Sequence, residues 1–290
     1  MASRNLILVD GMGLLYRAFY AIRDLSTKSG RPTNAVYGFI RMLRQAANTW
    51  DATHWAVVFD GGLPEARLEL YEDYKAQRAP MPDPLRDQVD DAERYLELAD
   101  VCMLRMEGQE ADDVMASLAA WAEPEADRVV IATSDKDMFQ VVNEKIHVVP
   151  GSGKKPAMGP EQIREKTGVP PEQVVEWLAL TGDAVDNIPG VPGVGAKTAA
   201  KLLREYGGLD GMWENLSGIS REKLRKSLED NRDTVMKNVE MVTLSRDLDC
   251  GVDWDDLLFR KPDPGRLLPF FEELEFEKMA DELRAGDLLL

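Results

Sequence analysis

Cysteine and histidine are nearly absent from this sequence, which has two of each among 290 residues. Two cysteines, Cys102 and Cys250, do not make a disulfide scaffold, and so few thiols are typical of a protein kept in a reducing compartment. Two histidines, His54 and His147, do not supply the ligands of ordinary zinc sites, which argues against metalloprotease-type chemistry. No motif surrounds either histidine, and we interpret both as structural.

Long apolar runs are missing as well. The longest are short strand-like runs such as 129–132, far below the roughly 18 to 20 residues that a membrane span needs. The N-terminal stretch has one basic residue and reaches Asp10 before a signal-type apolar segment can form. We therefore expect no membrane contact, no export and a cytoplasmic protein.

The composition is that of a globular chain, with 44% hydrophobic and 30% charged residues, enough for one large or two modest domains. The 35 basic and 52 acidic side chains give a net charge of −17, which taken alone argues against nucleic-acid binding. The charge is uneven, however. Residues 1–48 carry seven basic and two acidic side chains, whereas residues 49–150 carry nine and twenty-three. The distribution therefore decides more than the sum.

Short apolar, β-branched runs alternate with helical patterns in the first half of the chain. This alternation predicts an α/β domain with a mostly parallel central sheet and flanking helices. The predicted strands are 5–9, 55–59, 128–133 and 146–149, and the predicted helices are 14–23, 33–48, 84–99 and 110–121.

Beyond about residue 158 only helical patterns remain. They cover residues 160–167, 171–180, 196–205, 221–228, 232–244 and 267–284. The glycine and proline content of 151–156 makes it the best linker. We predict an α/β unit at 1–157 and a helical unit at 158–290 that ends in an acidic tail. Prolines 80, 82 and 84 interrupt 71–84 and predict an exposed bend.

Acidic side chains recur where predicted strands end. Asp10 follows the first strand, Asp60 the second, and Asp135 and Asp137 the third. The carboxyl ends of the strands in an open α/β sheet border one crevice, so we expect these side chains to face it together. Further acids stand at a predicted helix start and before a glycine-rich turn. They are Glu110, Asp112 and Asp113, and Asp183 and Asp186.

Converging carboxylates repel one another unless cations neutralise them. All-carboxylate ligation selects hard divalent ions, so the pattern predicts Mg²⁺ or Mn²⁺. Each acid taken alone is also compatible with capping the next helix. Four such groups together favour the metal site.

A glycine-rich turn precedes the predicted helix 196–205. It contains Gly190, Gly193 and Gly195, and the helix carries Lys197 and Lys201. Glycines let a backbone approach a ligand closely, and free amides at a helix start suit a phosphate. The turn resembles a helix-hairpin-helix element, which holds one strand of a duplex without reading its sequence. The alternative is an ordinary tight turn between helices. A Walker P-loop spacing is absent.

The ordered set of motifs resembles the 5′-nuclease family, that is, the flap endonucleases and 5′-3′ exonucleases. The likeness is strongest to the amino-terminal nuclease domain of bacterial DNA polymerase I and its free-standing relatives. The matching stretches are 8–20, 57–60, 74–82, 108–114, 133–140 and 182–198. The resemblance implies a PIN-like core, a helical arch at about 64–98 and a helix-hairpin-helix at about 183–206.

The resemblance also implies a two-metal site. Asp10, Asp60, Glu110 and Asp112 match the surroundings of one ion; the second is surrounded by Asp135, Asp137, Asp183 and Asp186, with Asp113 between the groups. All nine acids are present, which favours a competent nuclease. Two Mg²⁺ ions, with Mn²⁺ as a substitute, would support in-line phosphodiester hydrolysis. A monovalent cation at the glycine turn is left open.

The resemblance assigns basic and aromatic side chains to DNA. Lys75 and Arg78 match the catalytic basic pair at the base of the arch, where a cation near the scissile phosphate adds electrostatic stabilisation. Tyr74 stacks on a base or simply packs. Arg17 and Phe19 match the first helix near the displaced nucleotide, although Phe19 also fits a core position. Further cations available to phosphates are Lys154, Lys155, Arg221, Lys223, Arg225 and Lys226.

The sequence departs from the family in one place: residues 61–66 hold no basic side chain, where polymerase-linked relatives carry one soon after the aspartate. The expected activity is 5′-3′ exonuclease and flap endonuclease action on branched, nicked or 5′-flapped duplex DNA, or on an RNA primer paired to DNA, by a monomer. The alternatives are a catalytically silent DNA-junction binder and an RNA nuclease of the PIN group. A free-standing nuclease and a truncated polymerase domain are both compatible with the sequence.

Overall fold

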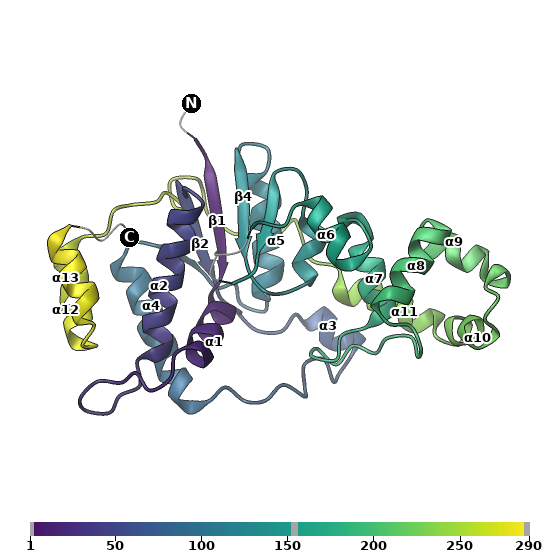
Figure 1. Ribbon diagram of the computed structural model, residues 1–290, viewed down its shortest axis with the longest axis horizontal. Coiled ribbons are helices and arrows are strands. Elements are labelled where there is room, and N and C mark those ends of the chain that lie inside the picture. The colour runs from purple at the N-terminus through teal and green to yellow at the C-terminus, as the bar shows by residue number, and fades with distance from the viewer. Residues whose placement is uncertain (1–2, 152–155, 287–290) are drawn as a thin grey trace.

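A parallel sheet forms the centre of the computed structural model, which describes residues 3–151 and 156–286 (Figure 1). In the described part the strands lie in the order β3-β2-β1-β4-β5, and every neighbouring pair is parallel. They are β1 (Asn5–Asp10), β2 (His54–Val58), β3 (Cys102–Leu104), β4 (Arg128–Ala132) and β5 (Ile146–Val149). The chain builds outward from β1 to β3 and then restarts at β4 on the other side of β1. The sheet therefore has a topological switch point between β1 and β4.

Helices cover both faces of the sheet because alternate strand residues point to opposite sides. Ile7 and Val9 belong to the core shared with one set of helices, and Leu6 and Leu8 to the core on the other side. The first set is α1 (Gly11–Ala21), α2 (Asn34–Thr49), α4 (Asp83–Leu98), α12 (Pro264–Glu273) and α13 (Glu277–Ala285). The other side carries α5 (Ala111–Ala122), the 3₁₀ helix η1 (Asp137–Val141) and the helical region.

The helical region extends away from the sheet, on the right in Figure 1. Its elements are α6 (Pro160–Thr167), η2 (Pro171–Gln173), α7 (Val174–Thr181), α8 (Ala196–Tyr206), α9 (Leu209–Glu214), η3 (Leu216–Gly218), α10 (Glu222–Asp230) and α11 (Arg232–Val242). Its apolar residues belong to the same core cluster as Leu6 and Leu8. The two parts of the chain therefore share buried surface.

After α11 the chain returns to the sheet. The amide of Trp55 donates to the carbonyl of Leu257 at 2.8 Å, and the amide of Phe259 donates to Thr53 at 2.9 Å. From there α12 and α13 pack beside α2 and α4, at the left in Figure 1. The C-terminal segment thus completes the core of the N-terminal one.

The predicted α/β class with its parallel sheet and helical second half is confirmed. Each of the four predicted strands is present within one residue of its expected ends. Sequence analysis missed β3, which has three residues, and α9, which has six. The predicted helix 267–284 is wrong: it is two helices, because Glu275 adopts a φ of +57° and the amide of Phe276 bonds back to Phe271.

The segment predicted as an arch contains two helices and an irregular stretch. α3 (Glu65–Leu70) and α4 are separated by residues 71–82, where the prolines stand. In Figure 1 this stretch crosses the lower side of the molecule from α3 to α4. Within the described ranges no helix combines the length and apolarity that a membrane crossing requires. Lys154 and Lys155 lie outside the described residues.

Candidate active site

Carboxylates gather at the C-terminal edge of the sheet, where the switch point lies. Asp10 is the last residue of β1, Asp60 follows β2, and Asp135 follows β4. With Asp112 of α5, these three side chains line a cavity of about 480 Å³. Asp10 and Asp135, which are 125 residues apart in the chain, thus meet at one crevice, as the strand-end pattern predicts.

The same cavity has cationic and apolar walls. Lys75, Arg78 and Arg105 border it together with the acids. Its apolar wall consists of Met12, Tyr16, Met81 and Val89. An opening of about 480 Å³ with both charge signs and an apolar side can take a charged group attached to a flat, apolar one.

Backbone and hydroxyl donors hold the acids of β1 and β2. Asp10 accepts a hydrogen bond from the amide of Gly13 at 2.7 Å, which caps α1, and one from the hydroxyl of Thr133 at 3.0 Å. Asp60 accepts from the amide of Ala111, at the start of α5, at 3.0 Å. Asp10 therefore caps a helix, as the alternative interpretation of the acids proposes. Its side chain also lines the cavity, so capping is not its only position of interest.

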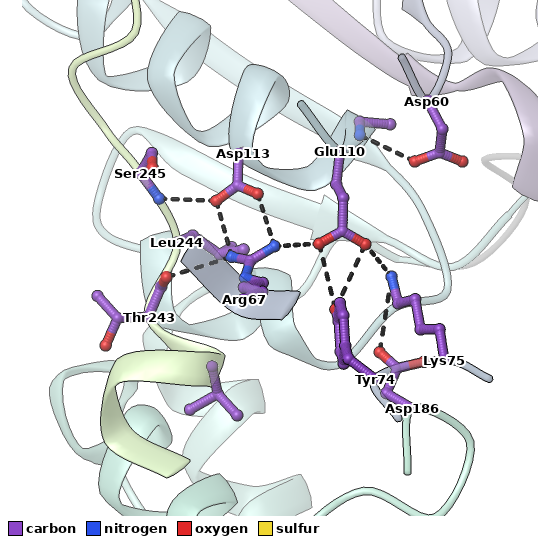
Figure 2. A network of polar contacts seen from close by, with 12 residues as sticks. Asp60, Arg67, Tyr74, Lys75, Glu110, Asp113, Asp186, Thr243, Leu244 and Ser245 are labelled. Carbon is purple, nitrogen blue, oxygen red and sulfur yellow. Dashed lines mark hydrogen bonds and ion pairs between the residues drawn. The ribbon is translucent and has the colours of Figure 1, made fainter. Parts of the chain in front are cut away.

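Two of the three acids at the start of α5 turn away from the cavity. Glu110 and Asp113 are both buried and contact the guanidinium of Arg67, which lies on α3 (Figure 2). The guanidinium donates to both oxygens of Asp113, at 2.7 and 2.9 Å. Asp112 faces the cavity instead, because adjacent residues of a helix point about 100° apart.

Arg67 also joins the nuclease core to the end of the helical region. Its guanidinium donates to the carbonyl of Thr243 at 3.3 Å, and Asp113 accepts from the amide of Ser245 at 2.8 Å. The side chain of Arg67 is nearly buried. Sequence analysis did not assign a role to Arg67, and no spacing signal could have, since its partners lie 43 to 176 residues away.

The basic pair of the arch lies among the carboxylates. Lys75 contacts Glu110 and lies 3.8 Å from Asp186, and Arg78 donates to Asp186 at 2.5 Å. Lys75 has a φ of +58°, and its amide donates to the carbonyl of Asp186. A non-glycine residue in this region is strained, and the surrounding contacts must hold it. Lys75 and Arg78, which the resemblance places at the base of the arch, therefore contact carboxylates.

Tyr74 is buried, and its hydroxyl donates to Glu110 at 3.2 Å. Of the two roles considered for this ring, the burial favours packing over stacking on a base. Arg17 is exposed on α1 and donates to the hydroxyl of Ser134, next to Asp135, at 2.5 Å. Phe19 is half-buried and contacts the ring of Tyr20 edge-on. Arg17 therefore reaches the carboxylate region, and Phe19 belongs partly to the core.

Asp137 and Asp183 make contacts of their own near Asp135. Asp135 accepts from the amide of Asp137 at 2.9 Å, while the Oδ1 atom of Asp137 is buried with no hydrogen-bond partner. Asp183 pairs with Lys136 at 3.1 Å. Within the described ranges, no three acidic, histidine or cysteine side chains converge tightly enough to form a ready-made metal cage. The carboxylates thus share one region, with cations between several of them.

Burial and mutual repulsion disfavour the charged forms of the cavity acids. Burial, with smaller contributions from Asp60 and Asp135, raises the pKa of Asp10 to about 6. Burial and neighbouring carboxylates also raise the pKa of Asp112, Asp135 and Asp137.

Glu110 behaves in the opposite way. Burial alone would raise its pKa, but the adjacent Lys75 and Arg67 outweigh that effect and hold the pKa below its usual value. Glu110 is thus the acid with its counter-charges already in place. Asp10, Asp112 and Asp135, in contrast, have raised pKa values chiefly because they are buried, so additional positive charge beside them would favour their ionised forms.

The glycine-rich turn joins α7 to α8 in the helical region. Gly193 has a φ of +84°, which favours glycine, and a Cβ on Gly190 would lie 2.1 Å from the carbonyl oxygen of Thr181. Gly195 precedes the first residue of α8, and Lys197 and Lys201 are exposed along that helix. The turn is therefore a close-packed hairpin with cations on its second helix.

Two family models match adjoining parts of the chain. The model described as "5'-3' exonuclease, N-terminal resolvase-like domain" matches residues 5–168, and "5'-3' exonuclease, C-terminal SAM fold" matches residues 169–265. The chain belongs to the 5′-3′ exonuclease family. The resemblance inferred from the ordered motifs is thereby confirmed, as are the nuclease core and the helical second unit.

Individual relatives agree with the family. The 5′-3′ exonuclease of Aquifex aeolicus is 37% identical over 280 residues, covering 97% of this chain and 95% of that protein. The thermostable DNA polymerase I of Thermus filiformis is 41% identical over 279 residues, covering 96% of this chain. The match spans 33% of that polymerase, so this chain corresponds to about a third of the polymerase relatives.

Solved structures share the fold of this 5′-3′ exonuclease family member. T5 5′-exonuclease, in a structure with bound divalent zinc ions, superposes with a TM-score of 0.70 at 25% identity, covering 82% of this chain and 89% of that one. The catalytic core of Rad2, solved with a DNA substrate, superposes with a TM-score of 0.68 at 19% identity, covering 99% and 93%. The Rad2 likeness establishes the common fold.

Proposed function

We propose that this chain is a Mg²⁺-dependent, structure-specific 5′ nuclease that hydrolyses phosphodiester bonds as a 5′-3′ exonuclease and flap endonuclease. The observation that carries the proposal is the cavity at the sheet's switch point, where Asp10, Asp60, Asp112 and Asp135 lie beside Lys75. Carboxylates of this kind bind hard divalent ions, and a cation beside them suits a phosphate. Membership of the 5′-3′ exonuclease family supports the same reaction class.

The acidic side chains fit divalent metal ions. The unpartnered, buried Oδ1 of Asp137 and the raised pKa values of Asp10 and Asp112 both call for additional positive charge. Asp10, Asp60 and Asp112 would hold one ion, with Glu110 near them in its pairs with Lys75 and Arg67. Asp135, Asp137, Asp183 and Asp186 would hold the second, and Asp113, which the resemblance places between the groups, stays paired with Arg67. T5 5′-exonuclease has been solved with divalent zinc. Oxygen-only ligation favours Mg²⁺, with Mn²⁺ as a substitute.

Two bound divalent ions would supply charge stabilisation for the attacking and leaving oxygens of an in-line displacement. The chain's own cations add to this. Lys75 and Arg78 lie on the cavity wall and would donate to the oxygens of the scissile phosphate, exchanging part of their contact with Glu110 and Asp186. The hydrogen bond from the Lys75 amide to the Asp186 carbonyl would keep Lys75 and Arg78 at this wall during the exchange.

The substrate in this proposal is branched, nicked or 5′-flapped duplex DNA, or an RNA primer paired to DNA, acted on by a monomer in the cytoplasm. The hairpin at Gly190, Gly193 and Gly195 would hold a duplex strand through its amides, with Lys197 and Lys201 on neighbouring phosphates. A monovalent cation at this turn is part of the same proposal. The Rad2 core was solved with a DNA substrate, which accords with a duplex-binding use of the fold.

Cleavage of a 5′-labelled flapped duplex tests the proposal. We expect release of the flap with Mg²⁺ or Mn²⁺ and none with EDTA. An unbranched blunt duplex carrying the same label serves as the control for structure specificity. Binding of the flapped duplex without cleavage under either metal would instead identify a silent DNA-junction binder.

Mg²⁺ should stabilise the fold, and more so at higher pH. A carboxyl group whose pKa is raised on folding stabilises the folded state fully below its unfolded pKa, which is about 4 for aspartate. For Asp10 this contribution is lost as the pH rises through about 6, its pKa in the folded protein. We therefore expect metal-free protein to lose stability across that window. At a free Mg²⁺ concentration of about 100 times the dissociation constant, binding adds about 2.7 kcal/mol, or about 5 °C in Tm.

Thermal unfolding at pH 5 and pH 7.5, with EDTA or with Mg²⁺, measures this effect. NaCl at matched ionic strength is the control for general screening. A Mg²⁺ shift no larger than the NaCl shift at pH 7.5 would contradict a metal site among these acids.

A further inference from the structure

Arg105 lies on the cavity wall next to Asp60, and the family reaction proposed above leaves it without a role. It is the first residue after β3, and it lines the same cavity as Lys75 and Arg78. Its side chain is 44% exposed, so its cation is reachable from solvent. Sequence analysis did not single it out, because β3 itself was missed.

The contacts of Arg105 leave most of its donors unused. One terminal nitrogen pairs with Glu93 of α4 at 2.6 Å, and the guanidinium lies over the ring of Phe59 with its carbon 5.3 Å from the ring centroid. Over the described ranges, the pair with Glu93 is the hydrogen bond found for this guanidinium. Arginine carries five N–H donors in a planar fork that matches a phosphate.

The loop beside Arg105 is fixed against the loop that follows Asp60. The amide of Gly61 donates to the carbonyl of Gln109 at 2.9 Å, and the amide of Gly108 donates to that of Gly61 at 3.0 Å. A Cβ on Gly61 would lie 1.8 Å from the carbonyl oxygen of Met106, so glycine is required for this approach. Arg105 is thereby held at the Asp60 side of the cavity.

Among the described residues that line the cavity, the cations besides Arg105 are Lys75 and Arg78. Residues 61–66 contain no basic side chain, and Arg67 is buried between Glu110 and Asp113. Lys75 and Arg78 enter from the segment that contacts Asp186. The carboxylates would repel a sugar-phosphate backbone that crosses the cavity past Asp60, unless Arg105 neutralised the phosphate there.

We propose that Arg105 binds a phosphate of the substrate strand at the Asp60 side of the cavity, and that Glu93 holds the guanidinium in place until the phosphate replaces it. This inference rests on the proposed nuclease function. Because Glu93 belongs to α4, binding of the phosphate releases the ion pair between Arg105 and that helix. Arg105 is a substrate-binding residue in this scheme.

Binding of a fluorescent 5′-flapped duplex, measured in Ca²⁺ so that it is not cleaved, tests the assignment. Loss of one neutralised phosphate removes about 0.7 to 0.9 from the slope of log K against log salt, which is about a five- to eightfold weaker affinity at 0.1 M salt. We expect this change for Arg105→Ala and less of it for Arg105→Lys. We expect tighter binding for Glu93→Gln, which frees the guanidinium.

Arg128→Ala is the matched control, because Arg128 is exposed at the start of β4, at the opposite edge of the sheet. It should leave the affinity and the slope unchanged. A neutral methylphosphonate can replace each phosphate of the strand in turn. At the linkage that Arg105 contacts, the replacement should weaken binding to the wild type and leave the affinity of Arg105→Ala unchanged.

Two outcomes would overturn the inference. One is an affinity of Arg105→Ala within twofold of wild type. The other is Glu93→Gln weakening binding as much as Arg105→Ala does, which would make the pair a structural one. Failure of the wild type to bind the flapped duplex would instead overturn the proposed function, so the two failures are distinguishable.

Discussion

Asp135→Asn is expected to slow cleavage of a flapped duplex by about 10³-fold, the effect of losing about 4 kcal/mol of metal-based charge stabilisation. Asp135 lines the cavity three residues after the end of β4. Asparagine has nearly the same shape as aspartate. Its side-chain oxygen can still accept the hydrogen bond from the Asp137 amide, which is 2.9 Å long in the wild type. The substitution removes the negative charge while leaving the fold intact. Binding of the duplex in Ca²⁺ should be retained, because the loss of one acid lowers repulsion towards phosphates.

Single-turnover rates with Mg²⁺ measure this prediction. Asp127→Asn is the matched control: Asp127 also accepts a backbone amide, that of Arg4 at 2.9 Å, but is exposed just before β4, at the other end of that strand. It should cleave at the wild-type rate. A rate for Asp135→Asn within tenfold of wild type would remove Asp135 from the proposed metal set.

Arg67→Ala is expected to lower the free energy of unfolding by about 3–5 kcal/mol, the usual effect of removing one partner of a buried ion pair. The substitution leaves Glu110 and Asp113 buried and facing each other without their shared cation. It also removes the hydrogen bond to Thr243. Arg67→Lys should recover part of the loss, because lysine restores the charge but not the two-pronged contact with Asp113.

Urea unfolding in EDTA measures these values without a metal contribution. Arg260→Ala is the control, since Arg260 pairs with Asp100 at 3.7 Å on the surface and exposed pairs contribute about 0–1 kcal/mol. Asp113→Asn and the double variant complete a cycle that isolates the coupling between Arg67 and Asp113. A loss for Arg67→Ala no larger than that for Arg260→Ala would contradict the network's importance.

Sequence reasoning worked best where a local pattern fixes a position. Apolar runs predicted four strands, and the acids that follow three of them pointed to the crevice, because strand direction alone determines that edge. The arrangement of Asp10, Asp60 and Asp135 follows from these rules. The glycine-rich turn was likewise readable from its composition, and it lies between α7 and α8 as expected.

Other features depend on contacts between distant segments and were not readable. Arg67 acquires its partners only when α3, α5 and the end of α11 come together. The opposite directions of Asp112 and Asp113 depend on how α5 is rotated against the sheet. β3 is too short to give a periodic signal, and Arg105 was missed with it. The break between α12 and α13 depends on one left-handed residue, Glu275.

The return of the chain from α11 to the sheet has a consequence for what counts as the smallest active unit. The carbonyl of Thr243 and the amide of Ser245 complete the coordination of Arg67 and Asp113, and Leu257 supplies a backbone partner to β2. A fragment that stops at the boundary between the two matched family models would lack all three. The surroundings of Arg67, Asp113 and β2 are therefore completed by residues of the second matched part of the chain, and that part should contribute to the stability of the first.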